Sequence, residues 1–189
     1  MLRFAVLGHL ATTSGKFSLS DMPGGAGRMD ILCRCVNASL FLSHGMRRDV
    51  EVYLVLLGPP DPPKTVLFPG KTVRYLSPDE RSSGSLIQKA LAQPVSEEFR
   101  ETTPGVFVRR GGLPELLAEY PFVLLDESGT DIRTVSLLPD NYLLSDHLNL
   151  NAQEVAAVAG MPVFSVGPLA LHADHTLTVL LNEHDRRAA

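Results

Sequence analysis

The sequence predicts an α/β fold with a mainly parallel sheet and helices on both faces. Residues 4–7 and 50–57 are continuous or nearly continuous apolar runs, which are typical of strands covered on both faces. Over the second half of the chain, strand segments alternate with helical segments, as they do in parallel α/β sheets. The length of 189 residues suits a single domain, over residues 1–189, with a sizeable core.

Composition and charge narrow the class of protein. Hydrophobic residues make up 44% and charged residues 20%, an ordinary balance for a soluble globular protein. No apolar run approaches the roughly 18 residues that a membrane span needs, so we expect a cytoplasmic protein with no membrane partner. With a formal net charge of -4, any contact with nucleic acid has to come from a local basic patch.

The first half of the chain starts with a strand at residues 3–7 and reaches a glycine-rich segment at 23–27. This segment lacks the Lys-Ser/Thr pair of a phosphate-binding loop. We therefore interpret it as a conformationally permissive segment that leads into a helix. Helical spacing follows over residues 28–43, and Gly45 is placed to end that helix. Cys33 and Cys35 point in different directions on such a helix, so we expect no disulfide and a core position.

The helix at residues 28–43 has two faces of different character. Its apolar stripe consists of Ile31, Cys35, Ala38 and Leu42. Its polar face carries Asp30, Arg34, Asn37 and His44. Because an amphipathic helix needs a polar face toward solvent, the pattern alone favours a solvated face over a functional site.

The middle of the chain combines strands with one well-marked helix. Residues 50–57 are the strongest strand, and the proline-rich segment 58–63 is a stiff loop. Residues 65–68 and 72–75 predict a short hairpin. A helix to about residue 93 begins with Ser77 as its N-cap, followed by Pro78 and Glu80.

Three strands of the second half predict where a ligand binds. The pattern gives strands at 106–108, 122–125, 142–144 and 163–166, with helices at 113–120 and 151–158. Asn151 and Glu154 form a capping pair for the last of these helices, and Gly160 ends it. Ligands bind at the carboxyl ends of such strands, which here are residues 125–126, 144–146 and 166–171.

The residues alone do not form a recognisable catalytic motif. The sequence contains neither a nucleophile elbow nor a dinucleotide-binding glycine fingerprint. His172, Asp174 and His175 suggest a metal site, but surface and capping roles are favoured, so we predict no metal. Asp146 and His147 follow a strand, where a turn role is the simplest interpretation.

Five separated motifs occur in a specific order, at residues 23–37, 41–44, 48–50, 78–82 and 167–175. Together they resemble the tRNA pseudouridine N1-methyltransferase family, which belongs to the SPOUT-like α/β-knot methyltransferases. The resemblance implies a C-terminal deep trefoil knot, a homodimer and S-adenosylmethionine as cofactor. It also implies methyl transfer to N1 of pseudouridine 54 in the T-arm of tRNA. The alternatives are methylation of pseudouridine in rRNA, as in a related knotted family, and a non-catalytic knotted RNA-binding or assembly protein.

The resemblance, with the helix pattern, assigns site residues. We expect the cofactor to be bound by Leu125, Ser145, Val166, Gly167, Pro168, Leu169, Ala170, Leu171 and Thr176. We expect Asp30, Arg34 and Asn37 to be catalytic, with Asp30 as a hypothetical general base. We expect RNA to be bound by Arg28, Arg47, Arg48, Arg109 and Arg110. Ser145 and Thr176 stand where some family members carry glycine and cysteine, which leaves their side-chain roles open.

Overall fold

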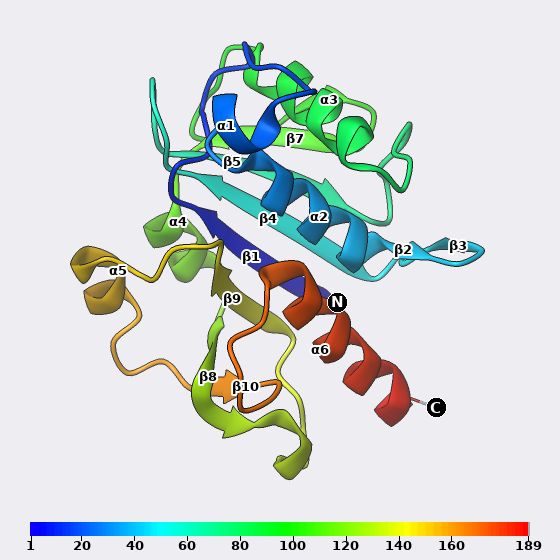
Figure 1. The fold of residues 1–189 in the computed structure, drawn as a ribbon, viewed down its shortest axis with the longest axis vertical. Coiled ribbons are helices and arrows are strands. Elements are labelled where there is room, and N and C mark those ends of the chain that lie inside the picture. Colours follow the sequence, from blue (N-terminus) through cyan, green and yellow to red (C-terminus); the bar gives the residue numbers. More distant parts are fainter. Residues whose placement is uncertain (189) are drawn as a thin grey trace.

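One eight-stranded sheet runs through the molecule, with the strand order β10-β8-β9-β1-β4-β5-β7-β6. The structure is a computed structural model that describes residues 1–188. The strands of this sheet are β1 (Leu2–Gly8), β4 (Val50–Leu56), β5 (Lys64–Pro69), β6 (Arg100–Thr103), β7 (Val106–Arg110), β8 (Val123–Asp131), β9 (Asn141–Ser145) and β10 (Val163–Ser165). A small hairpin of β2 (Phe41–Leu42) and β3 (Gly45–Met46) projects from one side (Figure 1).

The strands β10, β8, β9, β1 and β4 form a parallel half of the sheet. β1 lies between β9 and β4, and the side chains of residues 4–7 on it are fully buried. Because both faces of β1 are covered, its apolar residues do not alternate with polar ones. The predicted α/β fold is confirmed, and its two central strands are the two apolar runs of the sequence.

The strands β5, β7 and β6 extend the sheet in antiparallel pairing. The predicted hairpin of residues 65–68 with 72–75 is wrong, because β5 pairs with β4 and β7, and residues 72–75 form no strand. The turn after β5 is held instead by the amide of Gly70, which donates to the carbonyl oxygen of Val50 at 2.8 Å. No apolar run marks β6, since its sequence is Arg-Glu-Thr-Thr at the sheet edge.

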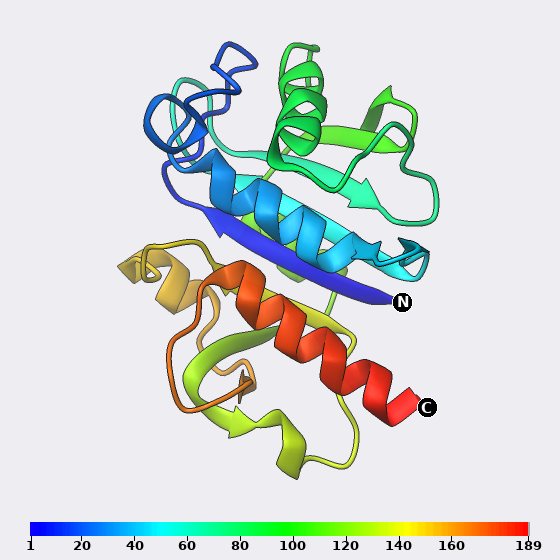
Figure 2. The same ribbon diagram turned by 45° about the vertical axis from the view of Figure 1, so that its right-hand side comes forward.

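Helices cover both faces of the sheet, as predicted. They are α1 (Met22–Gly25), α2 (Met29–Leu40), α3 (Glu80–Leu91), α4 (Leu113–Glu119), α5 (Ala152–Ala157) and α6 (Ala173–Ala188). Buried residues of α1, α2, α3 and α6 pack in one cluster with Phe4 and Val6 of β1, and α4 packs in another with Ala5 and Leu7. Figures 1 and 2 show α2 and α6 side by side on the first of these faces.

The glycine-rich segment brings the start of α2 close to the end of β1. Gly27 has φ +63°, and a Cβ atom there would lie 1.7 Å from the carbonyl oxygen of Leu10, so only glycine fits without movement. α2 ends at Leu40, earlier than predicted, because the chain turns into the β2–β3 hairpin. Gly45 therefore lies in that hairpin instead of ending the helix, and Leu42 is exposed rather than part of a buried stripe.

The first residues of α3 and α5 show which side chains cap these helices. The side chain of Asp79, not that of Ser77, caps α3 by accepting from the amide of Ser82 at 2.8 Å. The predicted capping pair of Asn151 and Glu154 is confirmed at α5. A side chain therefore caps both helices, but the cap of α3 lies two residues after the predicted one.

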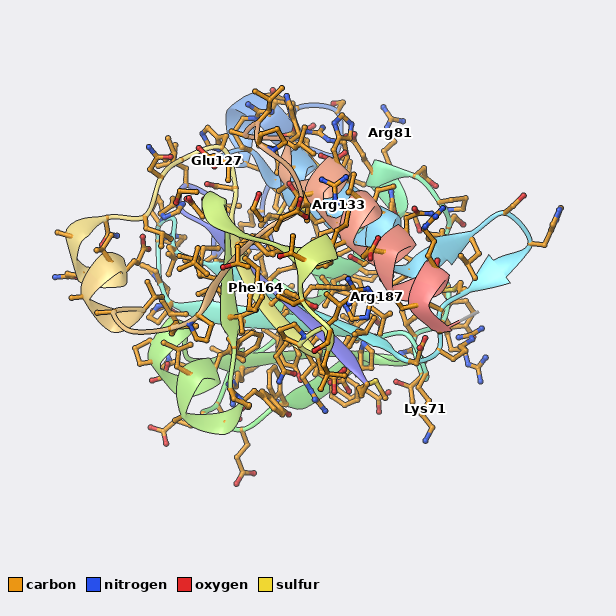
Figure 3. All side chains as sticks on the ribbon, turned by 90° about the horizontal axis from the view of Figure 1, so that it is seen from below. Lys71, Arg81, Glu127, Arg133, Phe164 and Arg187 are labelled. Atoms are coloured by element: carbon orange, nitrogen blue, oxygen red, sulfur yellow. The ribbon has the colours of Figure 1, made fainter. Side chains whose placement is uncertain are left out.

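The last helix crosses back from the sheet edge. β10 pairs with β8, yet α6 packs against α2, so residues 166–172 span the carboxyl ends of the intervening strands. Arg187 of α6, labelled in Figure 3, donates to the carbonyl oxygens of Ile132 and Val135, each at 2.7 Å. These contacts fix α6 to the segment after β8, which contains the short 3-10 helix η1 (Ile132–Thr134). No helix among residues 1–188 is long and apolar enough to cross a membrane.

Candidate functional site

A cavity of about 380 Å³ lies at the carboxyl end of the parallel strands. Its walls come from β8, from the turn after β9 and from the loop between β10 and α6. Eight of the nine predicted cofactor residues line it, namely Leu125, Ser145, Val166, Gly167, Leu169, Ala170, Leu171 and Thr176. The ninth, Pro168, does not line it. The structure therefore brings three segments far apart in sequence to one place.

The loop after β10 presents backbone groups along one wall. The hydroxyl of Ser165 is buried, accepts from the amide of Gly167 at 3.1 Å and donates to the carbonyl oxygen of the same residue. Beyond this tight turn, the amides of Leu169, Ala170 and Leu171 donate no hydrogen bond to any atom of residues 1–188. These amides are therefore available to a ligand.

The turn at residues 145–149 forms another wall. The hydroxyl of Ser145 donates to the carbonyl oxygen of Leu148 at 2.7 Å, and the amide of Leu148 donates to Asp146 at 3.0 Å. Asp146 thus has the turn role that its position after β9 indicates. Asp126 and Glu127 of β8 also line the cavity and add exposed carboxylates to it. Figure 3 labels Glu127 and Phe164, which lie on the neighbouring strands β8 and β10.

Asp30 anchors two arginines beside this cavity. Both of its oxygens accept hydrogen bonds from Arg28, at 3.1 and 3.0 Å, and one also accepts from Arg34 at 2.9 Å. Burial opposes ionisation of Asp30, but these hydrogen bonds outweigh it and lower its pKa. A carboxylate held in this way is a weaker proton acceptor than a free one, and the general-base role of Asp30 stays a prediction. The neighbouring Ile31 lines the cavity.

Arg34 and Asn37 have different surroundings. Arg34 also donates to Glu80 of α3 at 3.3 Å and lies 3.8 Å from Asp174 of α6. Asn37 accepts from the hydroxyl of Ser83 at 3.1 Å, which directs it toward α3. The polar face of α2 is thus largely covered by α3 and α6 instead of being solvated. Arg34 remains next to the cavity wall, while Asn37 belongs to the α2–α3 contact.

All five predicted RNA-binding arginines lie outside the cavity lining and have partners within the chain. Arg47 pairs with Asp185, Arg48 donates to the carbonyl oxygen of Gly70, and Arg110 pairs with Asp61. Arg109 pairs with Glu119 and has a side chain that is only 7% exposed. The expectation that Arg109 contacts an RNA phosphate is therefore inconsistent with its burial. Arg28, the fifth, is beside the cavity with a side chain that is 36% exposed.

The cysteines and the histidines near the start of α6 show no arrangement for catalysis or metal binding within residues 1–188. Cys33 and Cys35 are buried in α2, as predicted, and burial raises the pKa of both thiols. His172 and His175 have ring centroids 5.5 Å apart, and His175 lies 3.8 Å from Asp174. Within residues 1–188, no group of three or more His, Cys, Asp or Glu side chains is arranged to hold a metal ion.

One cation was not assigned a role from the sequence. Arg81 lies in the motif at residues 78–82, where its position indicates only a charge of the first helical turn. It follows Glu80, which pairs with Arg34, and it is exposed without an ion pair among the described residues. The packing of α3 against α2 places it on the same side of the sheet as Arg34.

Comparison with known proteins gives a consistent result. A family model described as "putative SAM-dependent RNA methyltransferase" matches residues 1–189. A "tRNA (pseudouridine(54)-N(1))-methyltransferase" of Methanocorpusculum labreanum is 54% identical, covering 99% of this chain and 98% of the relative. The protein so described from Methanosarcina acetivorans is 51% identical, covering 100% of this chain and 93% of the relative.

A solved structure supports the fold alone. Archaeoglobus fulgidus Nep1, bound to S-adenosylhomocysteine, superposes with a TM-score of 0.67 at 16% sequence identity, covering 100% of this chain and 99% of that one. The similarity in fold spans the whole chain. From the family match and the full-length relatives, the chain belongs to the family of putative S-adenosylmethionine-dependent RNA methyltransferases.

Proposed function

We propose that this protein methylates N1 of pseudouridine-54 in the T-arm of tRNA, with S-adenosylmethionine as the methyl donor. One observation carries the proposal. Eight of the predicted cofactor-binding residues line one cavity. The chain matches, over its whole length, relatives that are described as having this activity. Beside that cavity, Arg28 at the start of α2 and Arg34 on α2 are both held by Asp30.

The residues of the cavity suit S-adenosylmethionine. Leu125, Leu144 and Val166 offer apolar surface for a nucleoside, and the unpaired amides after Gly167 offer donors for its polar atoms. Asp126 and Glu127 supply negative charge for a ligand that carries a sulfonium and an ammonium group. When bound there, the cofactor supplies an electrophilic methyl group. The protein's part is to hold that group in line with the attacking nitrogen.

Arg34 is the residue that we assign to the target base. N1 of pseudouridine carries a proton and attacks well only once that proton is lost, so negative charge develops on the base. A guanidinium fixed beforehand stabilises such charge without further reorganisation. Asp30 fixes the guanidinium groups of Arg28 and Arg34, which gives it a positioning role. We assign phosphate contact to Arg28 and Arg81, which are partly or fully exposed.

Replacing Arg34 tests this assignment. Arg34→Ala is expected to slow single-turnover methylation at saturating RNA by about a hundredfold, because one stabilising cation is lost. Arg47→Ala is the matched control, since Arg47 follows the same helix but already pairs with Asp185. We expect its rate, RNA affinity and salt dependence to remain those of the unmodified protein. An unchanged rate for a folded Arg34→Ala protein refutes the assignment.

The finer features implied by the resemblance belong to the same proposal. They are a single domain over residues 1–189, a deep trefoil knot near the C-terminus, a homodimer and a cytoplasmic location. The return of α6 from the sheet edge to α2 supports the knot, because residues 166–172 must pass over neighbouring strand ends. The exposed side chains of Leu169 and Val179 support a second copy as a partner. Sedimentation of the purified protein measures whether it is a dimer.

Nucleoside mass spectrometry tests the function directly. The protein, labelled S-adenosylmethionine and a tRNA T-arm with pseudouridine at position 54 are incubated, and the RNA is digested to nucleosides. We expect labelled 1-methylpseudouridine from this RNA and none from a pseudouridine-containing rRNA fragment. Methylation of the rRNA fragment alone would favour the rRNA alternative. Cofactor-independent RNA binding without product would favour the non-catalytic one.

A further inference from the structure

A charged cluster of His9, Asp146 and Glu154 adjoins the cavity, and of the three only Asp146 lines it. His9 follows the last residue of β1, and its two ring nitrogens lie 2.9 Å from Asp146 Oδ1 and 2.9 Å from Glu154 Oε2. The side chains are only 9%, 1% and 9% exposed, respectively. None of the motifs that the sequence suggests for chemistry includes His9. Three ionisable groups buried in contact therefore need a physical explanation.

The geometry requires a protonated imidazole. With a carboxylate at each ring nitrogen, both nitrogens must donate, and only the imidazolium can do this. The hydrogen bond to Asp146 raises the pKa of His9, burial opposes the rise, and Glu154 adds to it, giving a value of about 9. His9 is therefore charged at neutral pH, and the hydrogen bonds to both carboxylates are charge-assisted.

Each carboxylate also holds backbone that shapes the site. Asp146 accepts from the amide of Leu148 at 3.0 Å and from the amide of His9 at 3.0 Å, which ties the turn at residues 145–149 to the end of β1. Glu154 accepts from the amide of Asn151 at 2.8 Å and so closes the capping box of α5. Residues 145–149 line the cavity, so His9 joins one of its walls to two other elements.

We propose that His9 is a positioning residue for cofactor binding, which holds the turn at residues 145–149 in its binding conformation by bridging Asp146 and Glu154. The inference rests on the proposed function, because it assigns that turn to the S-adenosylmethionine site. His9 does not line the cavity and acts through its hydrogen bonds to Asp146, which does line it, and to Glu154. Its effect should therefore appear in cofactor affinity before it appears in the methyl-transfer step.

The first test replaces His9 and a matched histidine. His9→Gln keeps a polar side chain of similar size but cannot donate at both positions. We expect it to weaken S-adenosylhomocysteine binding by about tenfold in calorimetry and to raise KM for S-adenosylmethionine similarly. The single-turnover rate at saturating cofactor should change much less. His184→Gln is the control, because His184 contacts Tyr142 of β9 at 2.8 Å, outside the cavity lining. We expect it to bind the ligand as the unmodified protein does.

The second test uses pH. The groups that face His9 are Asp146 after β9 and Glu154 of α5, with His147 3.4 Å from Asp146 and Arg28 adding charge near it. The folded pKa of His9 is raised from 6.5 to about 9, so its stabilising charge is fully present below pH 6.5 and is lost as pH rises through about 9. The affinity of the unmodified protein divided by that of His9→Gln should fall toward unity over this upper range. Taking the ratio cancels titration of the ligand itself.

The outcomes separate the inference from the proposed function. If the unmodified protein binds S-adenosylhomocysteine and methylates RNA, but folded His9→Gln shows the same affinity and KM, the positioning role is wrong and the function stands. If the unmodified protein binds no cofactor, both are wrong. Should His9→Gln fail to fold, Glu154→Gln provides the test, because it removes one charge of the cluster and lies outside the cavity lining. Unaltered affinity in that folded variant also overturns the proposal.

Discussion

A Gly167→Phe protein is expected to fold and to lose S-adenosylmethionine binding, with an affinity at least about a hundredfold lower, or about 3 kcal/mol. Gly167 lines the cavity of about 380 Å³, so a phenyl ring attached there competes with the ligand for space. A Cβ atom at this position meets no heavy atom within 4 Å, and its φ lies outside the left-handed region. The added side chain therefore costs the backbone little. Isothermal titration calorimetry with the folded variant measures the loss.

The chain offers a matched control for this change. A Cβ atom at Gly45, in the β2–β3 hairpin, would also meet no heavy atom within 4 Å, and the φ of Gly45 is likewise outside the left-handed region. Gly45 does not line the cavity. Gly45→Phe should therefore fold and bind the cofactor with unchanged affinity. If Gly167→Phe is folded and binds like Gly45→Phe, the loop after β10 is not a wall of the cofactor site.

The central strands and the cavity were predictable because their signals are local. The apolar run of β1 has no alternation, and the structure covers both faces of that strand. The small and apolar residues after β10 mark a loop that a ligand can approach closely, and they line the cavity. The order of strands then brings their carboxyl ends together by a general rule of parallel sheets. Local composition was sufficient at these positions.

Pairings between distant segments were not predictable in the same way. Residues 72–75 have a strand-like composition, but β5 pairs with β4 and β7. The predicted hairpin of β5 with residues 72–75 therefore does not form. Arg47 and Asp185 are 138 residues apart, and no local pattern indicates that they pair. The cluster of His9 with Asp146 and Glu154 joins segments 137 and 145 residues apart. The charge of a residue in the sequence therefore does not show by itself that the residue binds RNA, because the same charge can be paired within the protein.

Matched T-arm RNAs that differ only at position 54 should differ completely as substrates. We expect methyl incorporation into the RNA with pseudouridine and only background incorporation into the RNA with uridine. In uridine, N1 is bonded to ribose, so it has no proton to lose and no free lone pair with which to attack. In pseudouridine the base is joined through carbon, and N1 carries a removable proton. Labelled S-adenosylmethionine and nucleoside mass spectrometry measure both the amount and the position of the methyl group.

The selectivity should arise in the reaction and not in binding. The two RNAs have the same phosphates, so the half-buried Arg28 and the exposed Arg81 can neutralise the same charge on both, and the affinities of the two RNAs should agree within about threefold. The uridine RNA should therefore compete with the pseudouridine RNA as an inhibitor that is not consumed. Equal methyl incorporation into both RNAs would rule out attack by N1, since uridine can accept a methyl group only at another atom.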